Sequence, residues 1–76
     1  MKPDFLIIPF QLVEHEKIQP LDRDVYGLIY WFEHLKDGYC KAGNKKIAEM
    51  LHADPRSVQN ALSRLEKYGF IERRSQ

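Results

Sequence analysis

The chain has 76 residues, of which 43% are hydrophobic and 30% charged, with a formal net charge of +1. This length allows one domain, near the lower limit for folding on a single apolar core, and the composition is ordinary for a soluble globular protein. One cysteine, Cys40, excludes an internal disulfide and favours a reducing cytoplasmic location. The apolar runs are too short to span a bilayer, so no membrane-spanning helix is expected.

The charge is distributed unevenly along the chain. Residues 1–35 carry three Lys or Arg against six Asp or Glu, and residues 36–76 carry nine against five, which gives −3 and +4. A basic half indicates a polyanionic partner on one face, although a solvated basic surface would give the same count.

Two short apolar segments precede the first long helix. Phe5–Ile8 is expected to be extended, because Pro9 disfavours helical geometry in the residue before it. Phe10–Lys17 is expected to form a short helix, in a region that ends at Pro20.

A central helix is predicted over residues 22–36. Asp22 is a suitable N-cap. Gly27 costs about 1 kcal/mol of helix propensity, so it indicates close approach of another element. The apolar residues at helical spacing are Val25, Leu28, Ile29, Phe32 and Leu35. The aromatic residues that widen this apolar surface, and that form an exposed patch if nothing covers them, are Tyr26, Tyr30 and Trp31.

A second helix is predicted over residues 44–52, after a short strand at Tyr39–Lys41. Asn44 is a suitable N-cap for this helix. His52 and Ala53 then form a tight turn, with histidine at a place where glycine is more usual. Histidine tolerates left-handed backbone geometry better than most residues, which makes the turn feasible.

A third helix is predicted over residues 54–68. Asp54 is its N-cap and Pro55 its first residue, where the missing proline N–H costs nothing. Gly69 is the left-handed residue that ends it, and Phe70 is expected to contact Leu65 as in a Schellman motif. Phe70–Arg73 is predicted to be a strand.

The predicted fold is mainly α, with a three-helix helix-turn-helix core and a short β wing over residues 1–76. Only Arg74, Ser75 and Gln76 follow the last strand, too few for a second wing strand, so we expect a single domain that is the N-terminal part of a longer protein. The predicted core residues are Leu28, Ile29, Phe32, Ile47, Leu51, Val58, Leu62 and Leu65.

The pair of short helices predicts DNA recognition. In a helix-turn-helix unit the second helix, here about residues 55–68, enters the major groove. Arg pairs with guanine there, and Gln or Asn with adenine. An ordinary polar helix face is the alternative, but such faces are usually richer in Glu and Lys. The expected base-reading residues are Arg56, Ser57, Gln59, Asn60, Ser63 and Arg64.

Cations stand in the first turns of both of these helices. Lys45, Lys46 and Arg56 oppose the helix dipole there, and a bound phosphate would offset this cost. Solvated lysines would give the same pattern. The expected phosphate-contacting residues are Asn44, Lys45, Lys46, Lys67, Arg73 and Arg74.

The chain from Asn44 to Ile71 resembles the helix-turn-helix core of winged-helix DNA-binding domains. The residues that carry the resemblance are Ile47-Ala48, Leu51, Val58, Ala61-Leu62, Leu65 and Gly69-Phe70-Ile71. Upstream, Ile8-Pro9 followed by Asp22, Val25-Tyr26 and Leu28 is similar to the N-terminal domains of DnaD-type primosomal proteins, phage replisome organisers and plasmid replication initiators. The resemblance implies double-stranded DNA as partner, in replication initiation of the plasmid or phage type.

Two other functions remain open at this point. A transcriptional regulator shares the same core, and a winged helix can instead serve as a protein-interaction module that binds a second copy of itself or a replication protein. Nothing favours an enzyme, a small-molecule substrate or a cofactor, because no Gly-rich phosphate loop is present. A metal is not expected, since the histidines and Cys40 lack metal-ligand spacing.

Overall fold

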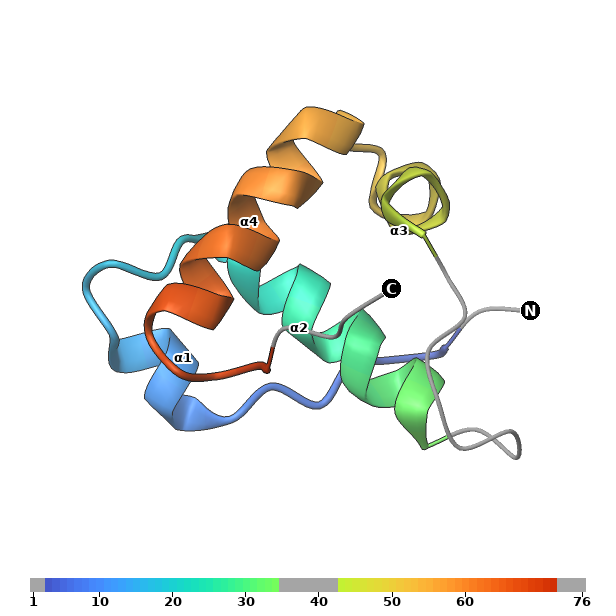
Figure 1. Ribbon diagram of the computed structural model, residues 1–76. Coiled ribbons are helices and arrows are strands. Elements are labelled where there is room, and N and C mark those ends of the chain that lie inside the picture. The colour runs from blue at the N-terminus through green and yellow to red at the C-terminus, as the bar shows by residue number, and fades with distance from the viewer. Residues whose placement is uncertain (1–2, 35–42, 73–76) are drawn as a thin grey trace.

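The computed structural model describes residues 3–34 and 43–72, and it is mainly α-helical. Its helices are α1 (Phe10–Glu14), α2 (Pro20–Glu33), α3 (Asn44–Leu51) and α4 (Pro55–Lys67). Figure 1 shows α4 lying across α2, with α3 beside the N-terminal end of α4. The three larger helices therefore follow in the predicted order.

No strand lies within the described ranges. Residues 70–72 form a bend and irregular chain, so the strand predicted over Phe70–Arg73 is not seen where the structure describes it. Arg73 and the predicted strand Tyr39–Lys41 lie outside the described residues.

The core is formed by all four helices and the α1–α2 connection. Its buried apolar residues are Leu12, Ile18, Val25, Leu28, Ile47, Ala48, Val58, Ala61 and Leu65. Four of these were predicted, namely Leu28, Ile47, Val58 and Leu65. The other predicted core residues are partly buried and pack against this cluster; they are Ile29, Phe32, Leu51 and Leu62.

The beginning of α2 differs from the prediction. Gln19 is the N-cap and Pro20 the first helical residue, a position that suits the fixed φ of proline. Asp22 is the third helical residue, and its Oδ2 accepts a hydrogen bond from the Gln19 N–H at 3.0 Å. The assignment of Asp22 as N-cap was therefore wrong, because its carboxylate reaches back to the N-cap backbone instead. The preceding helix, α1, ends at Glu14 rather than Lys17.

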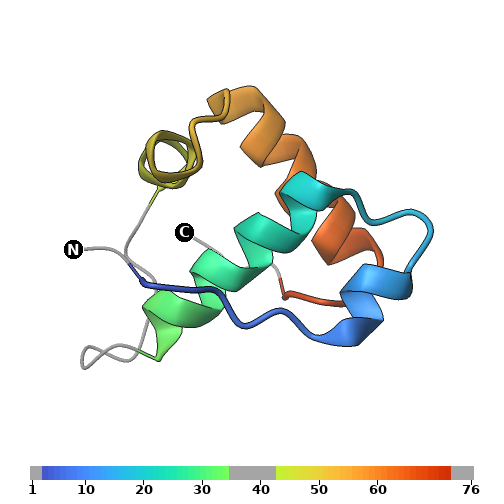
Figure 2. The same ribbon diagram turned by 180° about the vertical axis from the view of Figure 1, so that it is seen from behind.

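Residues 3–9 run along α2, as Figure 2 shows from behind. A Cβ built on Gly27 would lie 2.8 Å from the Cβ of Leu6, closer than two such atoms approach in proteins. Gly27 therefore allows this segment to lie directly on the helix backbone, which confirms the predicted close approach. Leu6 and Ile8 pack against the core, whereas Phe5 and Ile7 are exposed.

The ends of α3 and α4 are closed in the same way. His52 has φ 55° and Gly69 has φ 82°, so both predictions of left-handed geometry are confirmed. The Ala53 N–H donates to the Ala48 carbonyl at 2.9 Å, and the Phe70 N–H to the Leu65 carbonyl at 2.8 Å. Both are Schellman motifs, which stop each helix and set the direction of the chain after it.

Candidate nucleic-acid interface

A three-residue turn, His52 to Asp54, joins α3 to α4. The Asp54 side chain accepts a hydrogen bond from the Arg56 N–H at 2.7 Å, which confirms Asp54 as N-cap. In Figure 1 α3 is seen end-on while α4 lies across the view, so the two helices are steeply inclined to each other. Two inclined helices joined by so short a turn are compatible with the predicted helix-turn-helix core.

One side of α4 is polar and exposed, and we call it the polar stripe. Its members recur at intervals of three or four residues, opposite the buried Val58, Ala61 and Leu65. They are Arg56, Gln59, Asn60, Ser63 and Lys67. The stripe has two cations and no carboxylate, so it suits an anionic partner. Ser57, also predicted to read bases, is half-buried at its margin.

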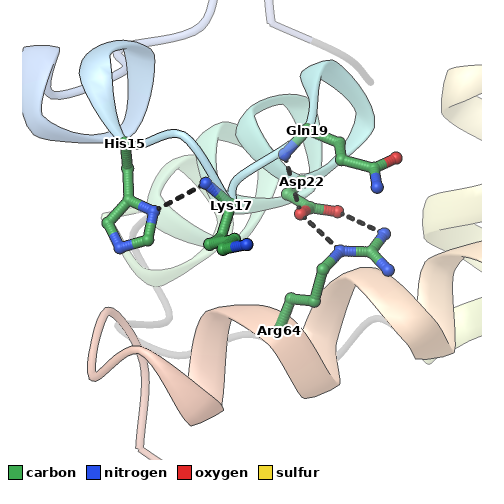
Figure 3. A network of polar contacts seen from close by, with 5 residues as sticks. All are labelled: His15, Lys17, Gln19, Asp22 and Arg64. Atoms are coloured by element: carbon green, nitrogen blue, oxygen red, sulfur yellow. Dashed lines mark hydrogen bonds and ion pairs between the residues drawn. The ribbon is translucent and has the colours of Figure 1, made fainter.

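Arg64 does not belong to the polar stripe. Its Nε donates to Asp22 Oδ2 at 2.7 Å and a terminal guanidinium nitrogen donates to Oδ1 at 2.9 Å (Figure 3). The carboxylate is fully buried, and the arginine side chain is 30% exposed. Arg64 was expected to point outward and read a base. That prediction was wrong, because two nitrogens of its guanidinium donate to the Asp22 carboxylate of α2.

The ion pair is a rigid link between α2 and α4. Asp22 Oδ2 also accepts the Gln19 N–H, so the carboxylate is fixed from its own helix as well (Figure 3). Hydrogen bonding to Asp22 raises the pKa of the Arg64 guanidinium, against the opposing effect of burial. Because the pKa of arginine is far above neutral pH even without this increase, the Arg64 guanidinium keeps its positive charge throughout the neutral range.

A second contact links the connection beyond α1 to the end of α4. The Lys17 N–H donates to His15 Nδ1 at 3.1 Å (Figure 3). The His15 ring lies 4.8 Å from the Tyr68 ring and 5.6 Å from the Phe70 ring, measured between centroids. Together with the ion pair, this contact holds the C-terminal end of α4 on the rest of the fold and leaves its N-terminal end exposed.

The start of α3 also differs from the prediction. Gly43 is the N-cap, without a side-chain hydrogen bond, and Asn44 is the first helical residue. The Asn44 Nδ2 donates to Gln59 Oε1 of α4 at 2.6 Å. The prediction of Asn44 as N-cap was wrong, because its amide is used between helices.

The predicted phosphate contacts fall into different environments. Lys45 and Lys46 are exposed in the first turn of α3. Lys67 is exposed at the end of α4, with its Nζ 5.5 Å from the Tyr68 ring centroid. Arg73 and Arg74 lie outside the described residues. At the start of α4 the Asp54 carboxylate already occupies the first-turn N–H of Arg56, so this end offers less to a phosphate than α3 does.

Two side-chain pairs at this interface were not predicted from the sequence, Asp22–Arg64 and Asn44–Gln59. For Arg64 a signal was present: it comes three residues after Ala61 and directly before Leu65, which places it at the border of the buried face. For Asn44 no comparable signal exists, because its partner lies on another helix.

No protein-family model matches the chain, and no match was found among curated proteins or solved structures. Residues 3–34 and 43–72 contain no group of three or more His, Cys, Asp or Glu arranged to hold a metal. None of the helices in these ranges is long and apolar enough to cross a membrane.

Proposed function

We propose that the chain is a cytoplasmic helix-turn-helix domain that binds double-stranded DNA through α4. The observation that carries this proposal is the polar stripe, a run of exposed Arg, Gln, Asn, Ser and Lys on α4, a helix whose single carboxylate, Glu66, is half-buried. Such side chains donate to and accept from base edges in the major groove. The tight turn from α3 exposes the N-terminal half of α4, which is the part that reads bases in this motif.

In this proposal the residues divide into two roles. Arg56, Gln59, Asn60 and Ser63 reach base edges, with Ser57 at the margin. Lys45, Lys46 and Lys67 neutralise phosphates, together with Arg73 and Arg74. Arg64 is instead a positioning residue, because its guanidinium is held by Asp22.

The biological process that we propose is replication initiation of the plasmid or phage type, on the resemblance of the upstream residues. The alternative is a transcriptional regulator, which would use the same contacts. Selection of bound duplexes from a random pool, followed by a search for the selected motif near replication origins and near promoters, separates the two.

The test of DNA binding is a titration against the selected duplex at several salt concentrations. Arg56→Ala should weaken binding by about 1–3 kcal/mol and relax preference at one base. Lys45→Ala should weaken binding to all sequences and reduce the salt slope by about one. The matched control is Lys17→Ala, an exposed cation of the α1–α2 connection. Equal behaviour of the three variants would refute the proposal.

A second candidate function, protein interaction, is favoured by four exposed large apolar side chains in the N-terminal segment and α1, which we call the apolar strip. Phe5 is 75% exposed, Ile7 55%, Phe10 69% and Val13 41%. In both ribbon views α1, the helix that contains Phe10 and Val13, lies far from the α3–α4 turn. Beside the strip is a hollow of about 260 Å³ that Phe5 and Ile7 line together with Trp31. Exposed apolar patches commonly mark protein contacts.

This candidate is tested by sedimentation of the chain over a range of concentrations. A second copy of the chain or a replication protein would be the partner. Tyr26, Tyr30 and Trp31 are half-buried, so the expected association depends on the strip rather than on these three. The double variant Phe5→Ser with Phe10→Ser should then sediment as a monomer. A wild-type chain that is monomeric at millimolar concentration excludes self-association as the role of the strip.

A further inference from the structure

The contact between Asn44 and Gln59 joins two residues for which the sequence predicted different tasks, a phosphate contact for Asn44 and base reading for Gln59. Asn44 is half-buried at the first position of α3, and Gln59 is exposed in the second turn of α4. The Nδ2 of Asn44 lies 2.6 Å from the Oε1 of Gln59, a short distance for an amide hydrogen bond. The pair therefore links the first turn of α3 to the second turn of α4.

The contact has a direction that matters for recognition. A glutamine amide has one face that accepts, at Oε1, and one that donates, at Nε2. A glutamine that reads adenine needs both, because adenine offers an acceptor at N7 and a donor at N6. Here the carbonyl oxygen is directed at Asn44 of α3, which takes one of its two lone pairs, and both hydrogens of Nε2 remain for another partner.

We propose that Asn44 is a positioning residue that turns the Gln59 carbonyl toward α3, so that Gln59 acts mainly as a hydrogen-bond donor toward DNA and this position prefers a base with acceptors over adenine. Guanine, with N7 and O6, and thymine, with O4, offer such acceptors in the major groove. This inference rests on the proposed function. In place of the phosphate contact expected from the sequence, Asn44 would affect DNA recognition by holding the Gln59 side chain.

The contact itself is tested on the free chain by NMR of the side-chain amides. Gln59→Ala should move the Asn44 side-chain NH₂ resonances toward random-coil positions, whereas Gln59→Glu should retain a hydrogen-bonded NH₂, because a carboxylate still accepts. Asn44 amide resonances that do not change in Gln59→Ala would overturn the proposal without any DNA experiment. The exposed Asn60→Ala variant is the matched control.

The direction of the contact is tested by base preference. The contacted base is the one at which preference disappears in Gln59→Ala. The wild-type chain should favour guanine or thymine there by about fivefold or more. Asn44→Asp has the same shape but accepts instead of donating, so the Gln59 amide should turn and present its oxygen. The preference should then move to adenine or cytosine, which carry donors at N6 and N4.

Two results would overturn the inference while the proposed function stands. One is a wild-type preference for adenine at the base that Gln59 contacts. The other is an Asn44→Asp variant that binds all sequences more weakly with an unchanged base preference, as expected of a phosphate contact. A chain that binds no duplex at all refutes the proposed function and this base preference together, and the NMR measurement then still decides the contact.

Discussion

Two regions of this molecule are helical for different physical reasons. From Gly43 to Phe70 the helix ends are set by residues that act on their own backbone, such as the Asp54 N-cap and the Gly69 C-terminal motif. From Pro3 to Glu33 the structure depends on contacts between distant parts of the chain, such as Leu6 on Gly27 and Asp22 with Arg64. Changes to the helix-end residues of the first region should therefore have small effects, and changes to the long-range contacts, whichever region supplies the residue, should destabilise the whole fold.

The largest effect is expected from Arg64→Ala. It leaves the fully buried Asp22 carboxylate without its cation, which should lower the free energy of unfolding by about 3–5 kcal/mol. Asp22→Ala should cost less, because the arginine left behind is already 30% exposed and can turn to water. Urea denaturation measures both. An Arg64→Ala variant as stable as Lys67→Ala, which removes an exposed cation from the same helix, would contradict the assigned role of the ion pair.

Gly27→Ala is expected to have the next largest effect. At an exposed helical position this change stabilises by about 1 kcal/mol, because alanine has the higher helix propensity. Here the new methyl group meets Leu6, so we expect a net loss of about 1–2 kcal/mol. Trp31 is the single tryptophan and lies beside the N-terminal segment, so its fluorescence should report displacement of that segment. A gain in stability would show that residues 3–9 do not lie against α2.

A smaller effect is expected at the start of α4. Asp54→Ala removes the acceptor for the Arg56 N–H and should cost about 1 kcal/mol. Asp54→Asn keeps an acceptor and should stay close to wild type. Thermal melting followed by circular dichroism distinguishes the two, and equal losses for both variants would mean that the charge of Asp54, rather than its hydrogen bond, stabilises the helix.

The smallest effect, and one of opposite sign, is expected at the turn. His52 adopts a left-handed conformation that glycine adopts without strain. Because His52 is also exposed, His52→Gly should raise the free energy of unfolding by about 0.5–1 kcal/mol. A lower melting temperature for this variant would indicate that the histidine side chain makes a stabilising contact.

Interactions between residues close together in the sequence could be predicted from it, and interactions between distant residues could not. His52, Asp54 and Gly69 were predicted because each satisfies backbone groups within a few residues of itself. Gly27 was predicted to mark a close approach, but its partner, Leu6, carries no signal of its own. Leu12 and Ile18 were missed, because the chain around them makes too few helical turns to show a period.

The Asp22–Arg64 ion pair shows most clearly that long-range contacts could not be predicted from the sequence. Asp22 fits the pattern of an N-cap, and Arg64 fits that of a base-reading residue, so each had a sufficient local explanation. Their actual partnership spans 42 residues and depends on how α4 crosses α2. The sequence therefore identified the helix that forms the candidate interface. Which of its polar residues are exposed could be decided only from the tertiary structure.

The wide separation of Asp22 and Arg64 also has a consequence for folding kinetics. Joining them closes a loop of 42 residues, an entropic cost that contacts within the α3–α4 pair avoid. Where such an interaction forms after the transition state, its loss accelerates unfolding more than it slows folding. The ion pair would thus act mainly on the lifetime of the native state, so a variant that lacks it would refold at a nearly normal rate and open far more often.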